Sequence, residues 1–76
     1  MTPQEFTQRI EEESISKSLF SIYDLPGDGM YTIQFYGDHY KVYYFERGIQ
    51  EYQQDFPSEG EALEYLLQLL RRDARR

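Results

Sequence analysis

Two β-prone runs separated by one tight turn constrain this fold more than any other part of the sequence. Residues 30–36 and 40–45 alternate in polarity, and the Gly37-Asp38 pair between them suits a two-residue hairpin loop of the primed type. That loop predicts a register in which the two strands agree on their apolar side, as a correct register must. The side chains on this face are Tyr31, Ile33, Phe35, Tyr40, Val42 and Tyr44.

A third strand is predicted for residues 51–56, after a three-residue turn at 47–49. Gly48 supplies the positive φ that such a turn needs. Placing Phe45 opposite Glu51 keeps the apolar side chains of this strand on the same face as those of the hairpin. The three strands then form an antiparallel meander with one apolar face, which needs a cover.

Capping boxes mark a helix at each end of the chain. Thr2 with Glu5, and Ser58 with Glu61, have the spacing of a capping box. In this motif the N-cap hydroxyl accepts from the backbone amide three residues later, and the acidic side chain at that later position accepts from the N-cap amide. The second helix carries one apolar stripe that would cover the meander. Its members are Leu63, Leu66, Leu67 and Leu70.

The predicted fold class is therefore α+β: a three-stranded antiparallel meander with helices at both ends, in the order α-β-β-β-α. The 76 residues allow a single small domain, residues 1–76, and the 8 Tyr and 5 Phe supply its apolar bulk. Residues 71–76 carry four Arg and one Asp, and we expect a basic C-terminal tail that frays.

Charge narrows the classes of partner. The net charge is −6 in all, and because the tail is basic, the rest of the chain is more acidic still. Such a body repels nucleic acid, which is bound through clustered Lys and Arg, and attracts cationic proteins. No apolar run has the length of a membrane span, and residues 1–5 do not resemble a signal peptide. We therefore expect a cytoplasmic protein without nucleic-acid or membrane partners.

The sequence offers little catalytic chemistry. The chain has no Cys and a single His, His39, which lies beside the predicted hairpin turn without a nucleophile at a diagnostic spacing. The Gly27-Asp28-Gly29 loop lacks the Lys-Ser/Thr that follows in a phosphate-binding loop. We expect a protein that is not an enzyme and that has no cofactor and no metal site.

The remaining possibility is a protein that binds another protein through its surface. The face of the meander opposite the leucine stripe combines aromatic residues with acids, as in the anchors and rim of a protein interface. The candidate contact residues on this face and its rim are Tyr36, Tyr43, Phe45, Glu46, Glu51 and Asp55. In an alternative interpretation, the first helix or the segment 15–23 covers this face and makes it a second small core.

Two stretches in the second half of the chain resemble a known family. They are Tyr40-Lys41-Val42-Tyr43-Tyr44-Phe45-Glu46-Arg47-Gly48 and Phe56-Pro57-Ser58-Glu59-Gly60-Glu61-Ala62-Leu63-Glu64-Tyr65-Leu66-Leu67. The pattern resembles small immunity proteins of bacterial polymorphic and contact-dependent growth inhibition toxin systems. It departs from that family at Tyr40, where Trp is expected, and at Leu63, where Cys is common.

The resemblance implies a non-catalytic inhibitor that binds a cognate toxin domain and covers its active site or substrate groove. The acidic body of the chain suits a cationic nuclease domain as that partner. The alternative is an acidic adaptor or regulatory subunit of a larger complex. A neighbouring gene for a large secreted protein with a variable C-terminal domain would favour the immunity protein.

Overall fold

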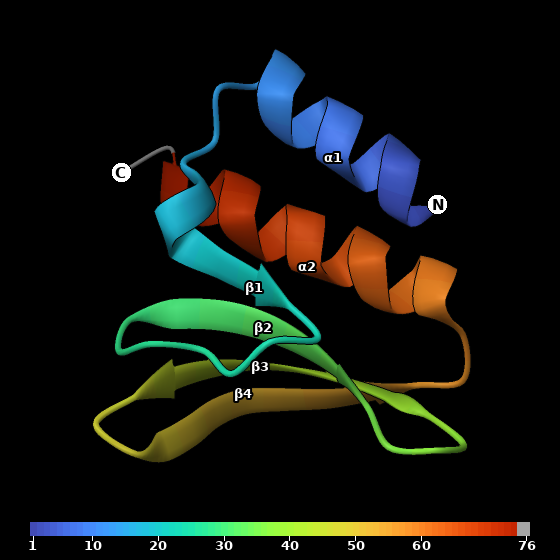
Figure 1. Ribbon diagram of the computed structural model, residues 1–76, viewed down its shortest axis with the longest axis vertical. Helices are drawn as coiled ribbons and strands as arrows, with labels where there is room; N and C mark the ends of the chain where they lie inside the picture. Colours follow the sequence, from blue (N-terminus) through green and yellow to red (C-terminus); the bar gives the residue numbers. More distant parts are fainter. Residues whose placement is uncertain (75–76) are drawn as a thin grey trace.

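The computed structural model describes residues 1–74. Its elements in chain order are α1 (Pro3–Glu12), the 3-10 turn η1 (Lys17–Leu19), β1 (Phe20–Ile22), β2 (Met30–Phe35), β3 (Tyr40–Glu46), β4 (Ile49–Phe56) and α2 (Glu59–Ala74). The predicted small α+β domain with a helix near each end is confirmed. The sheet is mixed and has four strands in the order β1-β2-β3-β4 (Figure 1), so the prediction of a three-stranded antiparallel meander is wrong.

The unpredicted strand is β1, which is three residues long and runs parallel to β2. Phe20 lies opposite Tyr31 and Ile22 opposite Ile33, and both β1 side chains pack against the core. Three residues show too little alternation to be recognised as a strand from sequence. Because parallel neighbours need a crossover connection, the segment 23–29 runs back along the sheet before β2 begins (Figure 1).

The central hairpin has the predicted register. Ile33 lies opposite Val42, and the pairing continues to Phe35 opposite Tyr40. Gly37 has a φ of +90°, and the Tyr36 amide donates to the His39 carbonyl at 2.9 Å, which closes a two-residue loop of the primed type. Local turn chemistry was therefore sufficient to set this register.

The pairing of β3 with β4 differs from the prediction because the connecting loop is shorter. Arg47 and Gly48 form a two-residue loop with φ values of +52° and +79°, and a β-bulge at Tyr52 then shifts the register. Tyr44 lies opposite Glu51, and Phe45 opposite Gln50 instead of Glu51. The shorter loop thus shifts the pairing by one residue from the predicted one. Because side chains alternate along a strand, this shift moves Glu51 to the face that packs against α2.

The core lies between the sheet and α2, which crosses β2, β3 and β4. All four leucines of the predicted stripe are buried. The helix α1 packs beside α2 in the same direction (Figure 1): Gly60 lies against the Met1 backbone at one end, and Arg71 Nη2 contacts Glu13 Oε2 at 2.6 Å at the other. The first helix therefore covers α2 and does not cover the outer face of the sheet.

In both predicted capping boxes the N-cap hydroxyl accepts the expected bond. The Glu5 amide donates to Thr2 Oγ1 at 3.2 Å, and the Glu61 amide donates to Ser58 Oγ at 3.4 Å. Of the expected basic tail, residues 71–74 belong to α2, and residues 75–76 lie outside the described part of the chain. No helix in residues 1–74 is both long enough and apolar enough to cross a membrane.

Candidate protein-binding surface

The outer face of the sheet, opposite α2, is partly covered by the crossover 23–29. Gln34 Nε2 donates to the Asp24 carbonyl at 2.7 Å, and the Arg47 amide donates to Asp28 Oδ1 at 3.2 Å. Tyr43 on this face is only 5% exposed, and burial is the main cause of its raised pKa. The expectation that Tyr43 is an exposed anchor is therefore wrong, because the sequence did not show where the crossover runs.

Two further candidates on this face have different environments. Phe45 is half-buried opposite Met30, next to the crossover. Tyr36 is 48% exposed, but its ring stacks on His39 with centroids 5.5 Å apart, and Lys41 Nζ lies 5.2 Å from the Tyr36 ring centroid. Tyr36 is thus accessible on one side and held in place by cationic or polar neighbours on the other.

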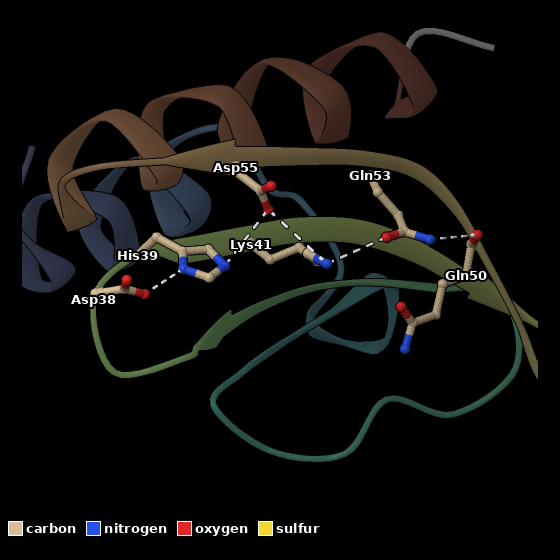
Figure 2. A network of polar contacts seen from close by, with 6 residues as sticks. All are labelled: Asp38, His39, Lys41, Gln50, Gln53 and Asp55. Atoms are coloured by element: carbon tan, nitrogen blue, oxygen red, sulfur yellow. Dashed lines mark hydrogen bonds and ion pairs between the residues drawn. The ribbon is translucent and has the colours of Figure 1, made fainter.

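Asp55 belongs to a polar network on the same face (Figure 2). Its Oδ1 lies 3.9 Å from His39 Nε2 and 4.0 Å from Lys41 Nζ. Asp38 Oδ1 contacts His39 Nδ1 at 2.6 Å, and this hydrogen bond is the main reason why the pKa of Asp38 is lowered. Acids and potential cations alternate in this network, so this part of the face presents little net charge to a partner.

Glu46 and Glu51, the remaining candidates, lie on the opposite side of the sheet at the end of the β3–β4 hairpin. Together they line what we call the hairpin-end pocket, a depression of about 200 Å³. Its lining is Tyr31, Tyr44, Glu46, Glu51, Tyr52, Arg72 and Asp73. A second, neighbouring depression of about 370 Å³ is lined by Glu46, Arg47, Ile49 and Glu51.

Aromatic rings form one wall of the hairpin-end pocket. The ring centroids of Tyr31 and Tyr44 are 4.8 Å apart, and those of Tyr44 and Tyr52 are 6.4 Å apart. Tyr52 is 59% exposed, as is the nearby Ile49. Ring faces beside carboxylates attract an ammonium or guanidinium group, because both carry negative electrostatic potential.

The tyrosine hydroxyls report the field inside this pocket. Burial first, and then the charges of Glu46 and Asp73, raise the pKa of Tyr44, with Glu51 adding to the effect. Burial and a hydrogen bond to Asp73 raise the pKa of Tyr31 to about 12, although Arg72 acts in the opposite direction. Three carboxylates, those of Glu46, Glu51 and Asp73, and one guanidinium, that of Arg72, line the pocket, so its lining has net negative charge and favours a cation.

Sequence reasoning placed Glu46 and Glu51 in the candidate surface but missed the tyrosines beside them. Tyr44 lies on the core face, as predicted, and the two-residue Arg47-Gly48 loop brings Glu51 to that same face. A signal was present in Arg47-Gly48, which suits a two-residue loop as well as a three-residue one. The shorter loop changes the side to which every following residue points until the bulge restores the pairing.

The described residues 1–74 contain no group of three His, Cys, Asp or Glu side chains arranged to hold a metal ion. No protein-family model, curated protein or solved structure matches this chain.

Proposed function

We propose that this chain is a non-catalytic immunity protein, which binds a basic toxin domain through the hairpin-end pocket and neutralises it. The observation that carries the proposal is the juxtaposition of Glu46 and Glu51 with exposed aromatic and aliphatic side chains at the end of the β3–β4 hairpin. The sequence resemblance to immunity proteins and the net charge of −6 support it.

The geometry suits inhibition by competition. A Lys or Arg side chain of the toxin would enter the pocket, where Glu46 and Glu51 supply charge and Tyr44 and Tyr52 supply ring faces. Cations that normally hold substrate phosphate in a nuclease groove would then be occupied. Such an inhibitor acts in the cytoplasm, where it meets the toxin, and needs neither cofactor nor nucleic acid.

Tyr52 and Ile49 would be the apolar anchors of this interface, because both side chains are largely exposed. Residues of this kind contribute most when a partner buries them completely. Tyr36 and Asp55, on the other face, would then lie outside the contact. Of the six residues named from the sequence, Glu46 and Glu51 are therefore retained as charged contacts. Tyr52 replaces the buried Tyr43 as the aromatic anchor.

The test begins with the domain encoded at the C-terminus of the adjacent secreted protein, if the gene has such a neighbour. Glu46→Gln and Glu51→Gln are each expected to weaken binding to that domain by about tenfold, or about 1.4 kcal/mol, mainly through slower association. Glu64→Gln, at an exposed position on α2, is the control that removes the same charge elsewhere. Calorimetry and stopped-flow association over a salt series measure both quantities.

Protection of growth separates inhibition from mere binding. The parent chain should restore growth of cells that express the toxin domain. The Glu46→Gln, Glu51→Gln double variant should do so poorly although its melting temperature does not fall. Binding without protection would favour the adaptor or regulatory subunit. Equal affinity of the parent and both pocket variants would exclude the hairpin-end pocket as the contact.

A further inference from the structure

The outer edge of β4 is open. This strand is the longest of the described sheet, at eight residues, and lies at its margin with no neighbour beyond it (Figure 1). All of its side chains except Phe56 are exposed, and the strand contains neither Lys nor Pro, so Glu51, Asp55 and the bulge at Tyr52 are its only edge-blocking features. Open edges offer unpaired main-chain amides and carbonyls to another strand.

The direction of these main-chain groups follows from the bonds within the sheet. The Gly29 amide donates to the Phe45 carbonyl at 2.8 Å, so Phe45 directs its main chain toward β2. Its partner in β4, Gln50, therefore directs its amide and carbonyl to the open edge, because pairs in an antiparallel ladder alternate. Lys41 lies an even number of residues from Phe45 and therefore also directs its main chain toward β2. Its partner in β4, Asp55, is likewise turned outward.

A side chain of the protein already uses one of these outward groups. Gln53 Nε2 donates to the Gln50 carbonyl at 3.3 Å, as Figure 2 shows. A Gln50 carbonyl that accepts from a side chain of its own strand agrees with this outward direction. A main-chain amide from a second strand would take the place of the Gln53 amide at that carbonyl.

The bulge at Tyr52 is what brings Gln50 and Asp55 to the same edge. In a regular strand, residues five apart point their main-chain groups to opposite edges and their side chains to opposite faces. The extra residue in β4 reverses the parity halfway along, so both residues face outward. Two copies of β4 then match in an antiparallel register in which Gln50 of each faces Asp55 of the other.

That register is also chemically self-complementary. It places Ile49 opposite Phe56 and Glu51 opposite Gln54, in addition to Gln50 opposite Asp55. Each carboxylate of the strand faces an amide side chain, no two acids face each other, and the apolar ends meet. Opposite like charges destabilise a strand pair, so their absence from a strand of an acidic protein favours self-pairing.

We propose that the chain forms a symmetric dimer in which two β4 strands pair antiparallel about a two-fold axis between Tyr52 and Gln53. The two sheets become one continuous sheet, an isologous contact in which each copy supplies the same surface. The dimer contact uses the main chain of β4, but Ile49, Glu51 and Tyr52 of this strand also belong to the proposed toxin contact, so the two surfaces share residues. Dimerisation is therefore measured on the free chain, without toxin.

Sedimentation equilibrium over a concentration series tests the dimer directly. We expect the mass to rise from 9.2 kDa toward twice that value with increasing concentration. High salt should strengthen the association, because each copy carries a net charge of −6 and salt screens the repulsion between the copies. The Debye length falls to about 3 Å at 1 M salt. A mass of one chain at every concentration and salt level would overturn the proposal.

Paired variants locate the contact. Gln50→Pro removes an outward amide and should leave a monomer, whereas Gln50→Ala keeps that amide and should dimerise as the parent does. Gln54→Glu would put two acids opposite each other and should weaken the dimer by about tenfold, roughly 1.4 kcal/mol. The control Gln68→Glu adds the same charge at an exposed position on α2 and should weaken it far less.

Hydrogen exchange of the parent chain needs no substitution and covers the case in which a variant unfolds. The Gln50 and Asp55 amides should exchange more slowly as protein concentration rises, while the exposed amides of the Gly37-Asp38 loop should not change. Exchange of Gln50 and Asp55 that is independent of concentration, or a Gln50→Pro variant that dimerises as the parent does, would show that β4 is not the contact. Failure of toxin binding has no bearing on these readings.

Discussion

Four non-glycine residues among residues 1–74 hold a left-handed backbone, and each marks the end or bend of an element. They are Ser14 (φ +54°), Tyr23 (+64°), Arg47 (+52°) and Tyr52 (+57°). At Ser14 the reason is the end of α1. The Ile15 amide donates to the Ile10 carbonyl at 3.0 Å and the Ser14 amide to the Glu11 carbonyl at 3.2 Å, the bonding of a Schellman cap.

Glycine at position 14 should stabilise the protein. The left-handed conformation costs a residue with a Cβ about 1 kcal/mol or more, and glycine at this helix-end position avoids that cost. We expect Ser14→Gly to raise the free energy of unfolding by about 1 kcal/mol in urea titrations. Ser14→Ala keeps the strain and should be close to the parent. A Gly variant no more stable than the Ala variant would contradict this explanation.

The stability at alkaline pH should depend on Tyr31. Its pKa is raised from 10.0 to about 12 in the folded chain, by burial and then by the bond to Asp73. Because the pKa of Tyr31 is higher in the folded chain than in the unfolded chain, the protonated hydroxyl stabilises the folded state. This contribution is complete below pH 10 and is lost as the pH rises toward about 12. The melting temperature should therefore fall over this range, and less steeply in Tyr31→Phe. Equal slopes for both proteins would rule out Tyr31 as the cause.

At the scale of elements, the least expected arrangement is the crossover that joins β1 to β2. A buried hydroxyl holds it: Thr32 Oγ1 donates to the Ser21 carbonyl at 3.1 Å and accepts from Gln34 Nε2 at 3.0 Å. Gln34 in turn donates to the Asp24 carbonyl. One polar cluster thus connects the shortest strand, its neighbour and the segment that covers the outer face.

Removal of this hydroxyl should loosen β1 and the crossover. Thr32→Val leaves the Ser21 carbonyl without that partner, and we expect a loss of about 1–3 kcal/mol in the free energy of unfolding. Thr32→Ser retains the hydroxyl and should keep most of the local protection. The Tyr23 amide, which donates to the Ile33 carbonyl, reports the effect by hydrogen exchange. Equal exchange at Tyr23 in both variants would argue against this role.

At the scale of the whole molecule, charge opposes compactness. The net charge of −6 in 76 residues produces self-repulsion that salt screens. Some acids are matched locally, as Glu13 is by Arg71 and Asp55 by Lys41, but Glu46 and Glu51 line the same depression. Their proximity is what makes the hairpin end attractive to a cation and costly to the isolated chain.

Salt should therefore stabilise the free protein. Between low salt and 0.5 M NaCl we expect the free energy of unfolding to rise by about 1 kcal/mol, which corresponds to roughly 4–8 °C in melting temperature for a domain of this size. Low protein concentration keeps any dimer from contributing. The pair of substitutions Glu46→Gln and Glu51→Gln should reduce the increase. A melting temperature that falls with salt would show that ion pairs outweigh the repulsion.

The sequence by itself determined the features that depend on neighbours in the chain. Gly37 with Asp38 set the register of the central hairpin, Thr2 and Ser58 began the helices, and the spacing of the leucines fixed the buried face of α2. Turn conformation, capping and helical periodicity act over a few residues, so these features can be predicted from the local sequence.

The tertiary structure decided what depends on contacts between distant segments. The three residues of β1 form a strand only because β2 is there to pair with them, and Tyr43 is buried on the outer face that the crossover 23–29 partly covers. The two-residue Arg47-Gly48 loop places Glu51 opposite Tyr44, and the bulge at Tyr52 then restores the pairing of β4 with the rest of β3. Because a one-residue shift turns a side chain to the other face, the position of the candidate site followed from this pairing and not from the sequence pattern.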